Sequence, residues 1–233
     1  MKKPKITADY HVHCGQYYET YYQPSTIIKS LYKNGIKEAW ISSTTSCIEW
    51  TNLEEKEYLL KHIEEEITEA VFTAKKLGIE LTPLYWVIPK RHFEGDKITM
   101  IMDNSLYKGF KIHPRIGDWN IANQLFEEIC HYASNHNLPI LIHTGTDNID
   151  SPKRFETYFS KYKTVKFILA HCKDTKNIIK IFSNFNNVCG DTAFCPKESY
   201  EEIKLAGFKD RIQFGTDFPI THWFEDTHKS HTT

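Results

Sequence analysis

The sequence lacks a long apolar run and an excess of charge of either sign. No apolar stretch approaches the roughly 18 residues that a membrane-spanning helix needs. The 29 Lys and Arg residues nearly balance the 30 Asp and Glu residues, and the formal net charge is -1. This balance gives no electrostatic argument for nucleic acid or an anionic membrane as a partner, and we expect neither.

The sequence also lacks a signal peptide and any paired spacing of cysteines. The N-terminal lysines are not followed by an apolar stretch, which a secretory signal would require. Without an export signal, scattered cysteines are expected to be reduced thiols, and the predicted location is the cytoplasm. The six are Cys14, Cys47, Cys130, Cys172, Cys189 and Cys195.

What is present is the composition of a folded globule. Hydrophobic residues make up 40% of the 233 residues and charged residues 25%, which excludes a disordered chain. Eight strand-like segments alternate with helical ones, and this order implies a parallel sheet with right-handed crossovers. The expected strands are 6–13, 36–42, 79–88, 109–113, 138–143, 165–171, 188–191 and 212–217. The expected helices are 24–34, 53–77, 97–106, 119–135, 153–162, 175–185 and 197–206.

Eight such repeats favour an α/β fold, a (β/α)₈ TIM barrel, as one domain over residues 1–233. Only 16 residues follow Asp217, so a shortened C-terminal helix is expected. An open doubly wound sheet is the structural alternative. That fold usually carries a glycine-rich phosphate loop after its first strand, and residues 13–17 contain no such loop.

The first strand ends in a pair of histidines, in Asp9-Tyr10-His11-Val12-His13. Residues two apart on a strand point to the same face, so Asp9, His11 and His13 are expected to share one. Two imidazoles placed in this way can bind one metal ion, although ordinary surface or core histidines remain the alternative. Asp9 is either a support for such a histidine or a cap of the strand.

Other predicted strands also end in polar residues. His143 and His171 close apolar runs, Asp217 ends the last strand, and Lys111 and His113 lie on the fourth. In a barrel the C-terminal ends of all strands lie on one rim, so these side chains would converge. Neutral imidazole and carboxylate groups suit Zn²⁺, and also Fe, Mn or Co.

Together these motifs resemble those of the amidohydrolase superfamily of metal-dependent hydrolases, specifically its amidohydrolase-related family. The resemblance extends from Asp9 to Pro219. It rests on His11-Val12-His13, Gly-Phe-Lys-Ile-His-Pro (109–114), Leu-Ile-His-Thr-Gly (141–145), Leu-Ala-His-Cys (169–172) and Phe-Gly-Thr-Asp-Phe-Pro (214–219).

The resemblance implies a distorted barrel that holds one or two divalent metal ions, with zinc expected first and manganese or iron as alternatives. His11, His13 and His143 would be ligands. His171 would be a ligand or would orient the substrate, and Asp217 would be both a ligand and the general base.

Lys111 matches the lysine that is carbamylated and bridges two metals in some members of the family. Members with one metal need no such bridge, so Lys111 is alternatively a plain cation for the substrate or an ion-pair lysine. The number of metals therefore stays open between one and two.

The chemistry expected of such a site is hydrolysis. A metal ion lowers the pKa of a bound water from 15.7 to about 7, and Asp217 beside it could pass the proton to a leaving group. Amides, lactones and esters are suitable substrates. One-metal members of the family also include decarboxylases and hydratases, which is the alternative reaction class.

Substrate contacts are expected from the loops that follow the strands. Lys90, Arg91, His113 and Arg115 are the candidates for binding a small, anionic molecule, with solvated surface charge as the alternative for the cations. A TatD-like deoxyribonuclease shares the histidine pattern, but such enzymes usually place a glutamate where this chain has Lys111. A barrel without turnover is the third hypothesis, and a homo-oligomer stays open.

Overall fold

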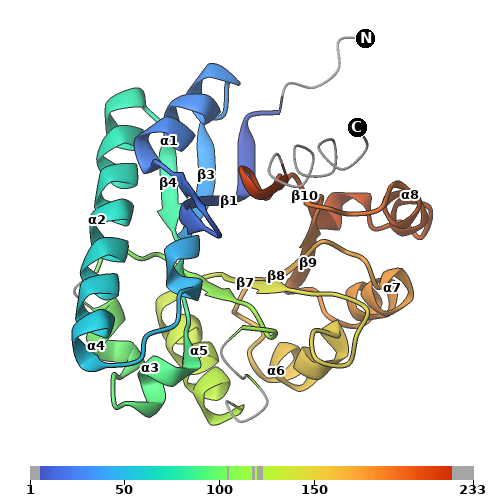
Figure 1. Ribbon diagram of the computed structural model, residues 1–233. Helices are drawn as coiled ribbons and strands as arrows, with labels where there is room; N and C mark the ends of the chain where they lie inside the picture. Colours follow the sequence, from blue (N-terminus) through green and yellow to red (C-terminus); the bar gives the residue numbers. More distant parts are fainter. Residues whose placement is uncertain (1–5, 104, 117–118, 120–122, 222–233) are drawn as a thin grey trace, which may run out of the picture. The chain divides into compact units, whose positions relative to one another are not determined.

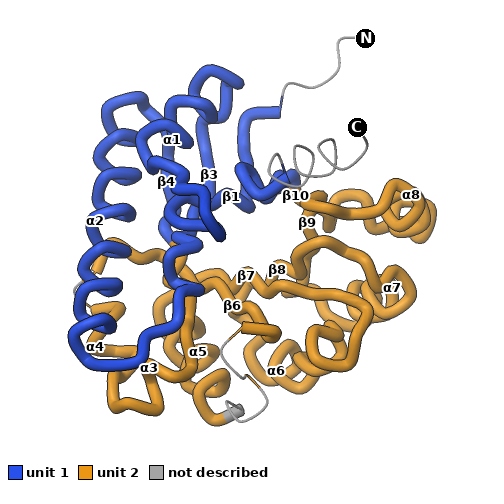
Figure 2. Tube along the Cα trace, viewed as in Figure 1, with its two compact units in different colours: residues 1–83, 214–233 blue, residues 84–213 orange. Residues whose placement is uncertain are grey.

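The computed structural model describes residues 6–103, 105–116, 119 and 123–221. The chain divides into two compact units, each with its own sheet (Figure 2). Unit 1 comprises residues 1–83 and 214–233, and unit 2 comprises residues 84–213. No helix in the described part of the chain is long and apolar enough to cross a bilayer.

Unit 1 contains a four-stranded sheet in the order β2-β1-β3-β4. The strand β1 is parallel to β3, and β3 is parallel to β4, whereas β2 is antiparallel to β1. Two long helices lie beside this sheet in Figure 1. The elements are β1 (Ala8–Tyr17), β2 (Thr20–Tyr22), α1 (Pro24–Lys33), β3 (Glu38–Ser43), the 3₁₀ turn η1 (Thr44–Cys47), α2 (Leu53–Leu77) and β4 (Glu80–Pro83).

The helices of unit 1 follow directly from the sequence. Pro24 starts α1, where its missing N–H costs no helical hydrogen bond. The side chain of Asn52 accepts a hydrogen bond from the backbone of Glu55 and caps α2. Gly78, with φ of 71°, ends α2 in the left-handed conformation that glycine adopts without strain. Apolar residues of α1, α2, β1 and β3 form the core of this unit.

The segment 214–218 completes unit 1 alongside β1. The backbone N–H of Tyr10 donates to the carbonyl of Phe214 (3.0 Å), and that of His13 donates to the carbonyl of Phe218 (2.8 Å). Between them, Asp217 donates its N–H to the carbonyl of His11 (2.7 Å). The end of the described chain is thereby held against the first strand.

Unit 2 is a parallel sheet in the order β10-β9-β8-β7-β6-β5, with helices in the connections (Figure 1). Its strands are β5 (Tyr85–Trp86), β6 (Phe110–Ile112), β7 (Ile140–His143), β8 (Phe167–Ala170), β9 (Val188–Asp191) and β10 (Ile212–Gln213). Its helices are α3 (Pro89–Phe93), α4 (Ile98–Met102), α5 (Asn123–His136), α6 (Glu156–Lys161), α7 (Thr175–Asn184) and α8 (Lys197–Leu205), with the 3₁₀ turns η3 (Pro152–Phe155) and η4 (Lys209–Arg211).

The central strands of unit 2, β6, β7 and β8, are mostly buried apolar runs, as is typical of parallel sheets. Phe110, Ile140, Ile142 and Phe167 are fully buried and belong to one core with apolar residues of α5, α6 and α7. Polar residues therefore appear in these strands only where a strand ends or where a buried polar group has a partner.

The predicted α/β class with parallel strands is confirmed, and the range expected for α2 is correct to the residue. The expected strand 79–88 is wrong as a single element, because β4 ends at Pro83 and β5 begins at Tyr85 in the other sheet. Pro83 has no N–H to continue a ladder. The expected strand 212–217 is shorter, since β10 ends at Gln213.

The sequence prediction lacked the strand β2 and the helix α3, besides the 3₁₀ turns η1 and η4. The strand β2 forms a hairpin with β1 through Tyr18, a non-glycine residue with φ of 49°, so the usual Asn-Gly or Asp-Gly signal is missing. The helix α3 is only five residues long. The expected shortened C-terminal helix falls within the 16 residues after Asp217, of which 222–233 lie outside the described part of the chain.

Candidate functional site

In unit 1, two histidines and one aspartate that the sequence predicts as metal ligands lie together. The Nε2 atom of His13 is 2.9 Å from Oδ1 of Asp217, and the Nε2 atom of His11 is 3.8 Å from the same oxygen. All three residues are buried, and one potential ligand atom from each lies within 4.8 Å of the others. These atoms could hold a metal ion.

The backbone of β1 and of segment 214–218 positions this group. The pairing of β1 with β3 shifts register between Asp9 and Val12, a local irregularity that spans His11. The two imidazoles meet edge to face, with ring centroids 5.0 Å apart at an angle of 75°. Asp217 has φ of 58°, a left-handed conformation that aspartate tolerates better than most residues and that is common at functional sites.

His13 has a second contact that fixes its ring. Its Nδ1 atom lies 3.0 Å from the hydroxyl oxygen of Ser42 and 3.3 Å from the carbonyl oxygen of the same residue. When Nδ1 carries the proton, it can donate to either oxygen and leave Nε2 free to act as a ligand. Ser42 gives no motif of its own, and only the pairing of His13 with Ser42 across β1 and β3 reveals its role.

Asp9 supports the same region through hydrogen bonds to two backbone N–H groups and to the Thr216 hydroxyl. Its carboxylate accepts from the N–H of His11 (3.2 Å), from the N–H of Thr216 (3.1 Å) and from the hydroxyl of Thr216 (2.7 Å). Asp9 is buried and therefore links β1 to the segment that carries Asp217.

The donor set of unit 1 fits a divalent transition metal. Two imidazole nitrogens and one carboxylate oxygen are the ligands found in catalytic zinc sites, which leave a coordination position for water or substrate. The same donors also suit manganese and iron.

In unit 2, His143 and His171 form a second histidine pair at the ends of β7 and β8. The Nδ1 atom of His143 lies 3.0 Å from Nε2 of His171, and the Nδ1 atom of His171 lies 2.9 Å from the carbonyl oxygen of Ala193. If Nδ1 of His171 donates to that carbonyl, its Nε2 atom carries a lone pair. His171 Nε2 and His143 Nδ1 could then both act as ligands of a metal ion. His171 has φ of 75°, so it lies in the turn directly after the strand.

Asp191 is a site residue that the sequence interpretation did not include. It is fully buried at the end of β9 and accepts hydrogen bonds from the N–H groups of His171 (2.9 Å) and Ala193 (3.1 Å). Asp191 therefore fixes the backbone of His171 and of Ala193, and the carbonyl of Ala193 in turn contacts the His171 ring. A signal was present, because Asp191 closes a predicted strand in the same way as His143 and His171 do.

Lys111 and His113, both from the predicted fourth strand, belong to an aromatic stack. The ring of His113 stacks on that of His143, with centroids 3.8 Å apart at 16°, and on that of Trp86 at 5.9 Å and 7°. The buried Lys111 Nζ lies 5.5 Å from the centroid of the Trp86 ring, a cation–π arrangement.

Two of the three cations expected to bind substrate are paired with carboxylates. Arg115 bonds Asp147 and Asp150, with 2.5 Å from its Nε to Oδ2 of Asp150. Arg91 Nε donates to Oδ2 of Asp96 at 2.7 Å. The third, Lys90, is exposed.

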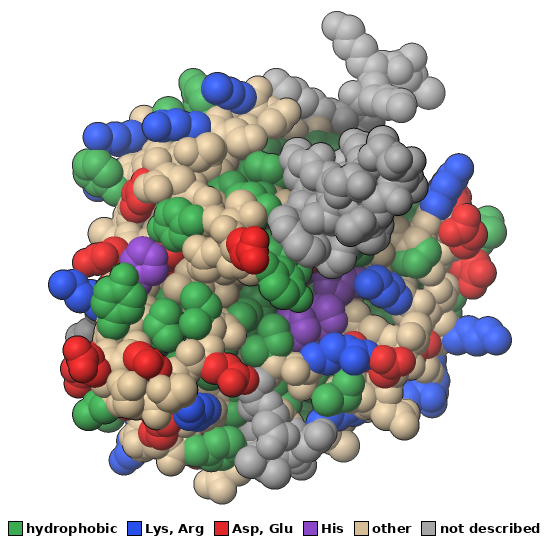
Figure 3. All heavy atoms as spheres, viewed as in Figure 1, with side chains coloured by type: hydrophobic (Ala, Val, Ile, Leu, Met, Phe, Trp, Pro, Cys, Tyr) green, Lys and Arg blue, Asp and Glu red, His purple; other side chains and the backbone are tan. Residues whose placement is uncertain are grey.

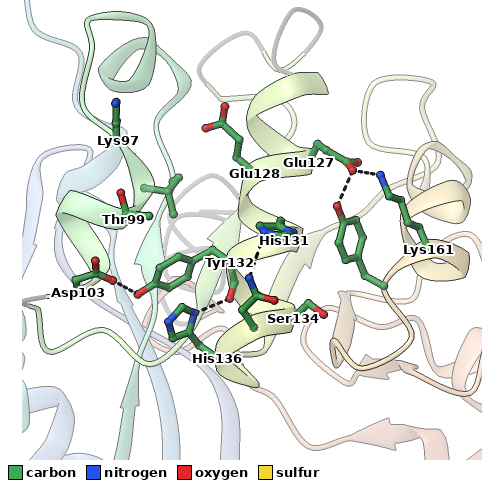
Figure 4. A pocket seen from close by; sticks show the side chains of 13 residues that line it. Lys97, Thr99, Asp103, Glu127, Glu128, His131, Tyr132, Ser134, His136 and Lys161 are labelled. Carbon is green, nitrogen blue, oxygen red and sulfur yellow. Dashed lines mark hydrogen bonds and ion pairs between the residues drawn. The ribbon is translucent and has the colours of Figure 1, made fainter.

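A groove of about 1050 Å³ also occurs in unit 2, between α4, α5 and α6 (Figure 4). Two pairs of its polar side chains bond each other: Tyr132 donates to Asp103 at 2.6 Å, and Tyr162 donates to Glu127 at 2.6 Å. No residue that the sequence predicts for the site lines it. We therefore assign it no part in the chemistry.

The charge distribution agrees with the balanced composition. On the face drawn in Figure 3, basic and acidic side chains are interspersed over the coloured part of the surface. This face gives no sign of the broad basic surface that a nucleic-acid-binding protein presents.

Solved structures of amidohydrolases share the fold of this chain. An amidohydrolase candidate from Staphylococcus aureus is 13% identical, with a TM-score of 0.62 over 92% of this chain and 88% of that one. A zinc-bound amidohydrolase from Burkholderia multivorans is 10% identical, with a TM-score of 0.53 over 92% and 85%. The 5-carboxyvanillate decarboxylase of Novosphingobium aromaticivorans, complexed with manganese, is 13% identical, with a TM-score of 0.55 over 79% and 67%.

Identities this low establish a shared fold and do not transfer a reaction. A search of curated protein sequences finds no match. The amidohydrolase family model Amidohydro_2, however, matches residues 97–229, which is more than half of the chain. The resemblance inferred from the sequence motifs is thereby confirmed, and the chain belongs to the amidohydrolase family.

Proposed function

We propose that the protein is a metal-dependent hydrolase that cleaves a C–N or C–O bond of a small molecule, such as an amide, a lactone or an ester. One observation carries the proposal: His11, His13 and Asp217 place two imidazole nitrogens and a carboxylate oxygen within 4.8 Å of one another in a buried position. In a member of the amidohydrolase family, this donor set would hold the metal.

Asp217 is the proposed general base. A divalent metal, when bound, activates water and polarises a carbonyl group. The Asp217 carboxylate can accept a proton from the attacking water and deliver it to the leaving nitrogen or oxygen. Its hydrogen-bonding distance to His13 and its tie to the backbone of His11 hold the carboxylate in place for both transfers.

For the histidines of unit 2 we propose the roles that the family implies, with His143 as a ligand and His171 as a ligand or a substrate-orienting residue. For Lys111 we favour the uncarbamylated form, because its Nζ faces the Trp86 ring as a cation would. This favours the one-metal branch of the family, with zinc as the first candidate. Arg91 and Arg115 are paired with aspartates, so the proposal does not depend on an anionic substrate.

The one-metal branch makes decarboxylation the second candidate reaction. The manganese-bound decarboxylase that shares this fold illustrates that the fold also accommodates that chemistry. Release of CO₂ from aromatic carboxylic acids, without hydrolysis of amides, lactones or esters, would favour it over the hydrolase.

The test is the metal content of protein purified without chelator or immobilised metal. We expect about one equivalent of zinc, manganese or iron per chain, and two would indicate that Lys111 bridges a pair of ions. Activity on a panel of lactones, amides and esters should disappear after chelation and return with the metal. Protein that carries no metal and takes up none would overturn the proposal.

A further inference from the structure

We propose that Asp150, anchored by Arg115, is a positioning residue that fixes the ring of His143 for metal binding. This inference rests on the proposed function, because it takes His143 as a ligand. It assigns a role to a loop residue that no motif in the sequence marks. All of the residues that carry it lie in unit 2.

Asp150 is a buried carboxylate. The residue is only 2% exposed, and its Oδ2 atom lies 2.5 Å from Nε of Arg115 and 3.7 Å from Nε2 of His143. Burial of an unpaired carboxylate is costly, and Arg115 supplies the charged partner that offsets this cost next to the imidazole.

Arg115 is suited to this anchoring role. Its side chain is 42% exposed and bonds two carboxylates, the buried Asp150 and Asp147, whose side chain is 64% exposed. The hydrogen bonds that Arg115 donates to Asp150 and Asp147 raise its pKa further above the ordinary value, so the guanidinium stays charged. The carboxylate of Asp147 bonds the arginine, whereas that of Asp150 contacts both the arginine and the histidine.

The loop after β7 is shaped to admit this carboxylate. Gly145 lies two residues after His143, and a Cβ atom there would come within 2.5 Å of Oδ2 and 2.8 Å of Oδ1 of Asp150. The N–H of Gly145 donates to the carbonyl of Asp150 at 3.0 Å and closes the loop. Among the described residues, Oδ1 of Asp150 has no hydrogen-bond partner. The contacts of the carboxylate with Arg115 and His143 are both made by Oδ2.

The ring of His143 is thereby defined on three sides. His113 stacks on its face, Nδ1 lies 3.0 Å from His171 Nε2, and Asp150 faces Nε2. The distance of 3.7 Å exceeds a hydrogen bond, so the interaction in this structure is electrostatic. A carboxylate on that side favours the tautomer with its proton on Nε2. This leaves the Nδ1 lone pair available as the ligand.

The experiment compares Asp150→Asn with Asp147→Asn, two substitutions that each remove one carboxylate from the same arginine. Zinc affinity is measured on metal-stripped protein by competition with a chromophoric chelator. We expect Asp150→Asn to weaken zinc binding by about 10- to 100-fold, and Asp147→Asn to change it by less than about twofold, as an exposed pair. Equal affinities in the two variants would overturn the inference.

A second readout is the tautomer of His143 in metal-free protein, from long-range ¹H–¹⁵N correlation spectra. The share of His143 that carries its proton on Nε2 should be larger in the wild type than in Asp150→Asn, and equal shares would contradict the inference. Arg115→Gln, which frees the same carboxylate, should also weaken zinc binding, whereas Arg115→Lys should restore part of it. Unfolding temperatures identify any variant that has lost its fold.

The two proposals fail in different ways. Wild-type protein that binds no metal overturns the proposed function, and the tautomer measurement still tests Asp150. Wild-type protein that binds metal, with Asp150→Asn unchanged in affinity and tautomer, overturns only the role of Asp150.

Discussion

The two histidine clusters are held in place by different means. In unit 1, the support comes from segments that are far apart in the sequence: Thr216 bonds Asp9, 207 positions away, and Asp217 bonds the backbone of His11. In unit 2, His143 and His171 are 28 positions apart on the paired strands β7 and β8. Aromatic stacking and a loop carboxylate complete the second cluster.

The difference indicates which cluster is more easily disturbed. Holding segment 214–218 against β1 requires closure of a long chain, whose entropic cost is offset by a few specific hydrogen bonds. The unit 2 pair is set by strand register within one buried sheet, which many contacts specify. We therefore expect substitutions around Asp217 and Asp9 to have larger effects than comparable ones around His171.

The largest expected effect is that of Asp217→Asn on turnover. Loss of a general base should lower kcat by about 10²- to 10⁴-fold, while the fold and most of the metal affinity persist because the His11 and His13 nitrogens remain. Steady-state kinetics on the best substrate of the hydrolysis panel measures it. The exposed Asp210 provides the control variant Asp210→Asn. An unchanged kcat would remove Asp217 from the role of base.

A glycine in unit 1 should be far less replaceable than a glycine of equal φ in unit 2. Gly15 and Gly207 both have φ of 89°, but only a Cβ at Gly15 would meet other atoms, at 2.5 Å from Thr45 Oγ1 and 2.8 Å from Glu66 Oε2. Gly207→Ala should cost about 1–2 kcal/mol of unfolding free energy from the backbone alone. Gly15→Ala should cost roughly 1–3 kcal/mol more, because the buried polar cluster must shift.

Urea unfolding of the two variants checks this difference. Equal losses of stability would show that the contacts around Gly15 relax freely. In that case the hydrogen bonds from Ser43 and Thr45 to the buried Glu66 would not constrain the end of β1.

A smaller effect is expected for the tie between Asp9 and Thr216. Thr216→Val removes the 2.7 Å hydrogen bond to the buried carboxylate of Asp9 and should cost about 1–3 kcal/mol, since the acceptor is charged. The matched change in unit 2 is Thr175→Val, which removes a 2.7 Å bond between two neutral hydroxyls and should cost about 1 kcal/mol. Thermal unfolding distinguishes them, and a larger loss for Thr175→Val would reverse the comparison.

The smallest effect concerns cysteine reactivity. A hydrogen bond with Cys172 lowers the pKa of Cys195, whereas burial raises the pKa of Cys14. A lower pKa gives a larger thiolate fraction at a given pH, so iodoacetamide at pH 8 should modify Cys195 well before Cys14. Peptide mass spectrometry follows the order, with denatured protein as the control in which all six thiols react. Early modification of Cys14 would contradict the burial of β1.

Much of this protein could be predicted from its sequence, because strand and helix periods and strand-end polar residues are local signals. The helix α2 and the strand β9 begin and end where predicted. The grouping of His11 and His13 follows from the two-residue repeat of a strand. The motifs at positions 109–114, 141–145, 169–172 and 214–219 were sufficient to identify the family.

The supporting residues could not be predicted, because their roles depend on which segments meet. Ser42 and Asp150 belong to no motif and acquire a role only through their distances to His13 and His143. A pattern of spacing does not show the aspartates that pair with Arg91 and Arg115 either, so the sequence interpretation left only substrate binding and solvated surface charge as alternatives for both arginines.

The sequence by itself determined most of the elements, the α/β class and the family, and it predicted His11, His13 and Asp217 as metal ligands. Each of these depends on residue type and on spacing along a single segment. Only the tertiary structure decided which carboxylate supports which histidine and which cations are neutralised. Those interactions fall off within a few ångströms, and the chain positions they connect lie up to 207 residues apart.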